Sequence, residues 1–563
     1  MNSHFQNEIT TSSKYSMKRL LTANRPKVCI LFLILLNFFT HFVFLPLYKF
    51  YSDDWSILAL PFMNQYSYSS LLLEGQRPFF WMMYKVQYDL FGDNPLGHHL
   101  LGFLTTSIVL VLVFEISKKI FQDIGQYAEY YPFLTAIIFC VLFNKDEVYP
   151  WAILSSGFPY IAYLASFYFY LHRERKYFLG CSLIAYTLGL FSYEIGIALP
   201  LLFVCYDYFI KREKRTGLLF LIPLTFYLTI RMTNWFGFGF AFINRGIGSW
   251  EIGALFSNAS HHVLYSFVVF SRQVNFALLG LATLAWWQLV GLLSIIGILL
   301  FLLGNLLNRE DKSDRIQPII FAISGMMIVT FFIPFILQGA MATRHFILVD
   351  FGIALLIVGL LSYGGNSRRI HWLMIIAVGI CILLNQGLYA NWVTSGNIQE
   401  DISRYIQDNS AEIANKEWIY FDVQSFFTEK PNQVVNPFTG LIKGLLFSET
   451  GSRHSATEVG VNNGGQGGTS IAMVYSPYYN SPCLDRWALE GMLQKYLPSF
   501  RSDQLIYGDY GNIPEKVTEY HIIVRDMYAG GVQREVLKSD CAVISYASIY
   551  GDTERSGASE QPP

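Results

Sequence analysis

The stretch KVCILFLILLNFFTHFVFLPLYKFYSDDW, residues 27–55, is an apolar run that ends in two adjacent carboxylates. Its apolar part has about the length that an α-helix needs to cross the hydrocarbon core of a bilayer. Similar runs recur along the chain and are separated by charged residues. Because lipid gives the backbone no hydrogen-bond partner, such runs cross a membrane as helices. The pattern therefore predicts a polytopic α-helical membrane protein.

The composition of the whole chain agrees with this prediction. The 563 residues are 53% hydrophobic, 17% aromatic and 14% charged, and the mean hydropathy is +0.35. Soluble domains carry about 25% charged residues, so a soluble globular protein is excluded. A membrane β-barrel would instead show segments of about ten residues with alternating polarity. No nucleic-acid-binding signature and no metal-spaced Cys/His set is present in the sequence.

Eleven apolar runs are predicted to cross the membrane. They cover residues 27–48, 97–117, 131–148, 157–171, 177–192, 195–210, 217–234, 284–307, 316–337, 346–363 and 371–391. Basic clusters fall on one side of this arrangement, which the positive-inside rule makes cytoplasmic. These clusters are Lys14, Lys18, Arg19, Arg25 and Lys27; Lys118 and Lys119; Arg173, Arg175 and Lys176; Lys211, Arg212, Lys214 and Arg215; Arg309, Lys312 and Arg315; and Arg368 and Arg369. Segment 261–283 is also apolar and is predicted to be interfacial or re-entrant, since another span would reverse the later loops.

Four regions follow from this topology. Residues 1–26 are predicted to be cytoplasmic, 27–392 to form the membrane domain, 397–550 to form an extracytoplasmic α/β domain, and 551–563 to be disordered. The charge changes sign between the halves, because residues 1–396 have a net charge of +7 and residues 397–563 a net charge of −8. The protein is thus expected in the plasma (inner) membrane, with its N-terminus cytoplasmic and its C-terminal domain periplasmic.

The C-terminal domain has globular composition. Residues 400–414 have helical spacing, and 417–423 are predicted to be a buried strand. Three more strand-like runs are IAMVYS, YHIIVRD and CAVISYASIY. Cys483 and Cys541 are its two cysteines and are candidates for a disulfide in an oxidising compartment.

Acidic residues gather on the predicted outer side. Asp53 and Asp54 follow the first span directly, and their mutual repulsion beside lipid suits a general base or a cation site. The alternative is a solvated helix cap. Asp146 and Glu147 lie in a short outer loop, and Glu194 lies in a tight turn between two spans. Glu194 is interpreted either as a helix-end charge or as an acid that converges on the Asp53–Asp54 site.

Outer-side cations complement these acids. Arg77, Arg231, Arg245, Arg272 and Arg344 are predicted at the depth where an isoprenoid phosphate headgroup would lie, and the arginine fork fits phosphate oxygens. Contact with ordinary lipid headgroups is the alternative for each one. Arg344, followed by His345, is the preferred candidate because it directly precedes a span. The remaining polar residues of the spans are interpreted as packing or interface positions: Asn37, His41, Glu115, Asp207, Trp286 and Trp287. For His98 and His99, which open the second span, a functional role is the alternative to packing.

Taken in order, these motifs resemble the GT-C fold glycosyltransferases, which are polytopic enzymes that use polyprenyl-phosphate-linked sugars. The resemblance covers about residues 50–390. It rests on the Asp53–Asp54 pair, on residues 75–100 (GQRPFFWMMYKVQYDLFGDNPLGHHL), on 146–157 (DEVYPWAILSSG), on 191–207 (FSYEIGIALPLLFVCYD) and on Arg344–His345. The matching positions are Arg77, Pro78, Gly92, His98 or His99, Glu147, Val148, Ser192, Glu194, Pro200 and Asp207. Tyr193 stands where the family usually has lysine. O-mannosyltransferases and O-antigen glucosyltransferases are similar in pattern.

The resemblance implies an inverting hexosyl transfer from a polyprenyl-phosphate sugar to a cell-surface glycan or protein, as in cell-envelope polysaccharide synthesis. In this reading Asp53 or Asp54 deprotonates the acceptor hydroxyl or orients it through a divalent cation. Glu194 and Glu147 organise the site. The donor phosphate is then held by Arg344, His345, Arg77 and Arg231.

Two other functions fit parts of the pattern. A lipid-linked glycan polymerase or ligase also needs outer arginine and histidine, but it does not need a carboxylate pair after the first span. A transporter or flippase would have charged or broken helices at the bilayer midplane and an internal repeat. The sequence predicts neither feature, so the glycosyltransferase is preferred.

Overall fold

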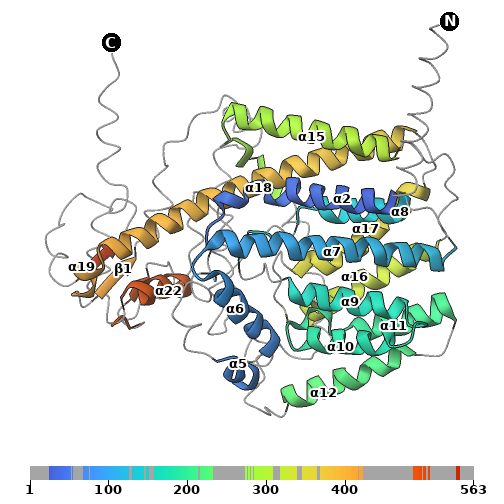
Figure 1. Ribbon diagram of the computed structural model, residues 1–563, viewed down its shortest axis with the longest axis horizontal. Coiled ribbons are helices and arrows are strands. Elements are labelled where there is room, and N and C mark those ends of the chain that lie inside the picture. The colour runs from blue at the N-terminus through green and yellow to red at the C-terminus, as the bar shows by residue number, and fades with distance from the viewer. Residues whose placement is uncertain are drawn as a thin grey trace, which may run out of the picture.

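The structure is a computed structural model that describes part of the chain. The described residues are 25–51, 54, 67–74, 77–125, 130–144, 148–150, 152, 157–212, 216–232, 273–274, 277–278, 280–282, 284–307, 318–338, 345–363, 368–415, 418–421, 486–497, 499–501, 505–507 and 541–544. They are mostly helical, and most of the helices lie side by side in one bundle (Figure 1).

The elements of the bundle follow one another along the chain. They are α2 (Arg25–Asn37), the π-helical turn η1 (Phe38–Phe42), η2 (Leu45–Leu47), α5 (Tyr68–Glu74), α6 (Pro78–Phe91), α7 (Pro95–Asp123), α8 (Tyr130–Val141), α9 (Phe158–Leu171), α10 (Phe178–Leu190), η5 (Glu194–Gly196), α11 (Leu199–Tyr206), η6 (Asp207–Lys211), η7 (Thr216–Phe220), α12 (Leu221–Met232), α15 (Trp286–Leu307), α16 (Ile319–Gln338), α17 (Phe346–Tyr363) and α18 (Arg368–Asp408).

Each of the eleven predicted runs contains a helix, so their helical structure is confirmed. Among the residues that the structure describes, four helices are long and apolar enough to cross a membrane: Pro26–Leu47, Pro95–Asp123, Trp286–Gly304 and Trp372–Asp408. Shorter apolar helices accompany them, including α8, α10, α16 and α17. The chain is thus a multi-pass helical membrane protein. Segment 261–283, predicted to be interfacial or re-entrant, lies largely outside the described residues.

Helices that follow one another along the chain pack as hairpins, and helices far apart in the sequence also pack together. α9 packs against α10, α16 against α17, and α7 against α8, while α15 lies along α18 at the edge of the bundle (Figure 1). Trp286 and Phe301 of α15 are 72% and 70% exposed. Large apolar side chains on the rim of a soluble protein would be costly, whereas at the rim of a membrane bundle they face lipid.

The first span is not one regular helix. After α2 the chain widens into the π turn η1, and Gln386 of α18 donates through Nε2 to the carbonyls of Phe39 and Thr40 at 2.6 and 2.8 Å. A π turn leaves carbonyl groups unpaired within the helix, so a partner from another helix can bind them. The turn therefore fastens the first span to α18.

The last helix of the bundle continues into the C-terminal region. α18 has 41 residues, which corresponds to about 60 Å, and it passes through 392–397, where the membrane domain was predicted to end. The predicted helix 400–414 is the end of α18 followed by α19 (Ser410–Ala414). Apolar residues have helical spacing on both sides of the predicted boundary, so nothing local ends the helix there.

The C-terminal region also contains a short parallel sheet. Its strand order is β2 (Leu505–Tyr507), β1 (Trp418–Phe421), β3 (Cys541–Ile544). β1 and β3 lie within predicted strands, whereas β2 was not predicted. The predicted strands 471–476 and 520–526, Cys483 and the tail 551–563 lie outside the described residues. Helix α22 (Arg486–Tyr496) packs on α18 and buries Leu489 and Met492.

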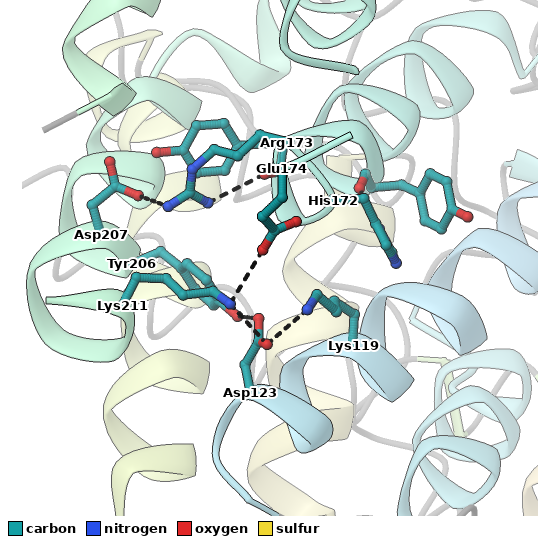
Figure 2. Close-up of polar contacts among 10 residues, drawn as sticks. Lys119, Asp123, His172, Arg173, Glu174, Tyr206, Asp207 and Lys211 are labelled. Atoms are coloured by element: carbon teal, nitrogen blue, oxygen red, sulfur yellow. Dashed lines mark hydrogen bonds and ion pairs between the residues drawn. The ribbon is translucent and has the colours of Figure 1, made fainter. Parts of the chain in front are cut away.

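A cluster of ion pairs closes the end of the bundle at which α7 finishes. Figure 2 shows Lys119 and Lys211 pointing at one oxygen of Asp123, at 2.8 and 2.9 Å. Beside them, Arg173 binds Oδ1 of Asp207 at 2.8 Å. The other oxygen of Asp207 accepts the backbone N–H of Gly217 at 3.0 Å. Asp207 was expected to serve packing, and these bonds join the α9–α10 turn to η6 and η7.

The buried pair Arg173–Asp207 gives a stability prediction. Asp207→Ala leaves the Arg173 guanidinium without its carboxylate in a nearly buried position, so the free energy of unfolding should fall by about 3–5 kcal/mol. Denaturant unfolding in detergent measures this loss. Glu174→Gln is the control, because Glu174 is exposed and lies 3.6 Å from Lys211, and it should cost at most about 0.5 kcal/mol. Equal losses in both variants would contradict the prediction.

Candidate functional site

A buried ion pair lies at the opposite end of the bundle, where α7 begins. Arg77, the residue before α6, donates from Nε and Nη2 to Oε2 of Glu194, at 3.0 and 2.9 Å. Tyr227 of α12 donates its hydroxyl to Oε1 at 2.9 Å. Glu194 is 2% exposed. Both oxygens of this carboxylate are thus bound by protein groups from two distant segments.

The turn that carries Glu194 is shaped by close packing. Tyr193 is extended, and Glu194 begins the 3-10 turn η5 between α10 and α11. A Cβ atom at Gly196 would overlap the ring of Tyr163, so this position requires glycine. The hydroxyl of Tyr163 also donates to the carbonyl of Tyr193 at 2.7 Å. Tyr163 therefore contacts the turn at two points, with its ring at Gly196 and its hydroxyl at Tyr193.

Tyr193 links the ion pair to the start of α17. The guanidinium of Arg77 lies over the Tyr193 ring, 4.5 Å from its centroid, and Phe80 stacks near the same ring. The Tyr193 hydroxyl and Nε2 of His345 are 2.8 Å apart. Arg77, Glu194 and His345 were each proposed from the sequence as site residues, and the structure brings these three together through Tyr193.

The ion pair keeps Arg77 charged. Burial disfavours the charged guanidinium, but the Glu194 carboxylate outweighs burial and raises the pKa of Arg77 above its ordinary value. The Arg77 side chain is still 22% exposed. Within the described residues, no hydrogen bond or ion pair joins its Nη1 to another side chain. Arg77 is therefore a permanently charged donor, and Glu194 binds it along the Nε–Nη2 edge of its guanidinium.

Asp54 belongs to a second polar cluster. Its Oδ2 accepts two backbone N–H groups, from Tyr51 and from Ala152, each at 3.0 Å. The carbonyl of Ala152 in turn accepts Nε2 of Gln87 at 2.8 Å. Asp54 is fully buried. Two amide donors on one oxygen favour the ionised carboxylate and fix its orientation.

Helix α6 spans the distance between the two clusters. Arg77 precedes its first residue, and Gln87 lies ten residues further on, which is about 15 Å along a helix axis. Glu194 was predicted as an acid that converges on the Asp53–Asp54 site. In the structure the two acids have separate partners. Glu194 binds Arg77, just before the start of α6, whereas Asp54 binds Ala152, which contacts Gln87 near the end of α6.

Several predicted site residues are not part of the described structure. Asp53, Glu147 and Arg344 lie outside it. Arg231 belongs to α12, and its side chain is not described. The described residues contain no group of three or more His, Cys, Asp or Glu side chains placed for a metal ion. The proposed cation site at Asp53 and Asp54 stays a prediction.

Asp350 and Tyr227 are among the polar residues of the bundle that the sequence analysis missed. Asp350 lies in α17, is fully buried, and accepts Nδ2 of Asn144 on Oδ1 at 2.7 Å. The signal was present, because an acid inside the apolar run FILVDFGIALL is costly unless it has a role. Tyr227 gave no signal, since an aromatic residue in an apolar helix is ordinary.

Comparisons with known proteins give only distant similarity. No family model matches the chain, and no curated protein matches it. Among solved structures, it is similar to the crystal structure of ArnT from Cupriavidus metallidurans bound to undecaprenyl phosphate, with 13% sequence identity and a TM-score of 0.38. The match covers 74% of this chain and 84% of that chain. The function of this chain has to be inferred from its own residues.

The Arg77–Glu194 pair should behave as a coupled unit. Arg77→Met strands a buried carboxylate and should cost about 3–5 kcal/mol of unfolding free energy. Adding Glu194→Gln removes the stranded charge and keeps an acceptor for Tyr227, so the double variant should recover more than half of that loss. Unfolding in detergent measures both. Lys495→Met is the control, because its partner Asp93 is half exposed, and it should cost at most about 1 kcal/mol. A double variant no more stable than Arg77→Met would refute the coupling.

Proposed function

We propose that this chain is a membrane glycosyltransferase of GT-C type. It transfers a sugar from a polyprenyl-phosphate donor to a glycan or protein acceptor on the extracytoplasmic face of the plasma membrane. The proposal follows from the order of the sequence motifs. The observation that carries it is the Arg77–Glu194 pair, joined through Tyr193 to His345 at one end of an apolar bundle.

The position of this group suits a lipid-linked anion. The group lies where helices begin and end, so a phosphate bound there could keep its isoprenoid tail among the apolar helices. Glu194 already holds Arg77 in one orientation, and a guanidinium that is already oriented loses less conformational entropy when it binds phosphate. Its Nη1 and the imidazole of His345, next to the N-terminus of α17, would donate to phosphate oxygens. Arg344 and Arg231 complete the proposed set.

The reaction needs one base and one stabilised leaving group. The acceptor hydroxyl oxygen attacks the anomeric carbon and forms the new glycosidic bond, while the bond from that carbon to the donor phosphate oxygen breaks. The proton of the hydroxyl passes to a carboxylate, and the bonding electrons leave with the polyprenyl phosphate. Arg77 and His345 stabilise the charge that develops on this phosphate. The anomeric configuration is inverted.

The two adjacent carboxylates receive different roles. Asp54 holds the amide of Ala152 and the amide of Tyr51 on one oxygen, and such bonds weaken a carboxylate as a base. We assign Asp54 as the residue that fixes the backbone after the first span. Asp53, its neighbour along the chain, is then the proposed base. Glu194 orients Arg77, and Glu147 remains a proposed site residue.

Substitution by asparagine separates these two roles. Asp53→Asn should lower the transfer rate at least about a hundredfold, because a base is lost. Asp54→Asn should lower it less, because the amide oxygen still accepts both N–H groups. The assay measures transfer of radiolabelled sugar from a polyprenyl-phosphate donor in membranes that contain equal amounts of each variant. Near-normal transfer in Asp53→Asn would remove the base assignment, and the reverse order of effects would exchange the two roles.

A conservative change at Arg77 tests donor recognition. Arg77→Lys keeps the positive charge but loses the forked geometry, so the donor KM should rise at least about tenfold while the acceptor KM stays within about twofold. Titration of each substrate in detergent separates the two constants. Arg404→Lys, the same substitution on the exposed part of α18, should change neither. A rise in the acceptor KM alone would place Arg77 on the acceptor side.

A further inference from the structure

The segment that follows α8 is anchored at its start by a buried acid. Asn144 donates Nδ2 to Oδ1 of Asp350 at 2.7 Å. Asp350 lies in α17, near the beginning of that helix and five residues after His345. Ionised or polar groups inside an apolar bundle are costly unless a partner binds them. The bond therefore fixes Asn144, three residues after the end of α8, to α17.

The middle of the same segment rests on a buried histidine. The rings of Tyr149 and His41 are parallel within 3°, with centroids 3.6 Å apart. Nε2 of His41 lies 2.8 Å from the carbonyl of Cys140, and since a carbonyl only accepts, Nε2 carries the proton. On the other edge of the ring, Nδ1 lies 2.7 Å from the hydroxyl of Tyr389. The imidazole is bound on both edges, so it presents a fixed face to Tyr149.

The far side of the segment is bound to the Asp54 carboxylate. Ala152 gives its N–H to Asp54 and receives Nε2 of Gln87 on its carbonyl. Asn144, Tyr149 and Ala152 thus contact four different parts of the chain. Asn144 binds α17, Tyr149 stacks on η1, and Ala152 binds both α6 and the chain after the first span. Two of these anchors, His41 and Asp350, are inside the apolar bundle.

We propose that His41 and Asp350 are positioning residues for the transfer reaction. They hold Asn144 and Tyr149 from inside the membrane body, and Ala152, which follows them along the chain, binds Asp54 through its amide. This role rests on the proposed function, because Asp54 matters for transfer only if its neighbour Asp53 is the base. An apolar residue at either position would be cheaper in lipid, so the polar side chains are explained by the geometry that they impose.

A purely structural role predicts something different. His41 could simply satisfy the carbonyl of Cys140 in the last turn of α8. Loss of His41 would then reduce global stability, and activity would fall only with the folded fraction. A positioning role instead predicts a local loosening at Ala152 and a change in turnover without a matching change in donor affinity.

Two readouts on the full-length protein in detergent distinguish these roles. Hydrogen exchange of the 148–157 peptide reports the Ala152 amide, and steady-state transfer gives kcat and the donor KM. In both His41→Leu and Asp350→Ala, exchange should accelerate at least about tenfold. kcat should fall at least about tenfold, with the donor KM within about threefold. Asp350→Asn should restore both values, since its Oδ1 still accepts from Asn144.

Ser166→Ala is the matched control. It removes a buried hydrogen bond to Ser182, between α9 and α10, and should leave both readouts unchanged apart from a loss of stability. The proposal is overturned if exchange stays normal in His41→Leu and Asp350→Ala, or if exchange rises while kcat per folded molecule does not change. If the unchanged protein transfers no sugar, the proposed function fails on its own. The exchange data then still decide whether these residues hold the Ala152 amide.

Discussion

A hydrocarbon environment offers no hydrogen-bond partner, and this constraint governs which parts of the chain meet. Each polar side chain inside the bundle must be bound by another part of the protein, or it costs several kcal/mol. Asn37 therefore binds Thr106 and Ser107 of α7, and Gln386 binds the carbonyls that the π turn of the first span releases. These few bonds specify the neighbours of the first span, which apolar packing alone would leave open.

The same constraint has different consequences at the two ends of the bundle. At the end of α7, Asp123, Asp207 and their cations bind one another, and the result is a fastening between turns. At its beginning, Glu194 is fully occupied, whereas Arg77 keeps a partly exposed edge. A charge that is fixed in place before its ligand arrives needs little reorganisation when a phosphate departs. The proposed chemistry depends on this difference.

Helices α6 and α17 connect the elements of the proposed site. α6 follows Arg77 and carries Gln87, so it fixes the spacing between the Arg77–Glu194 pair and the Asp54 cluster. α17 begins after His345 and carries Asp350, so the Tyr193–His345 contact and the anchor of Asn144 share one rigid element. A glycosyl transfer requires the base and the leaving group on opposite sides of one sugar, and rigid helices maintain such a distance better than loops.

The sequence by itself determined the membrane class, the helical structure of the eleven apolar runs, and the choice of Arg77, Glu194 and His345 as candidate site residues. Hydropathy over about twenty residues is a local property, so it can be read from a window of the chain. Only the tertiary structure decided the partners. Arg77 meets Glu194 across 117 residues, Tyr193 meets His345 across 152, and Asn144 meets Asp350 across 206. No local pattern encodes these pairs, because each arises from how the helices pack and from the need to satisfy every buried polar group.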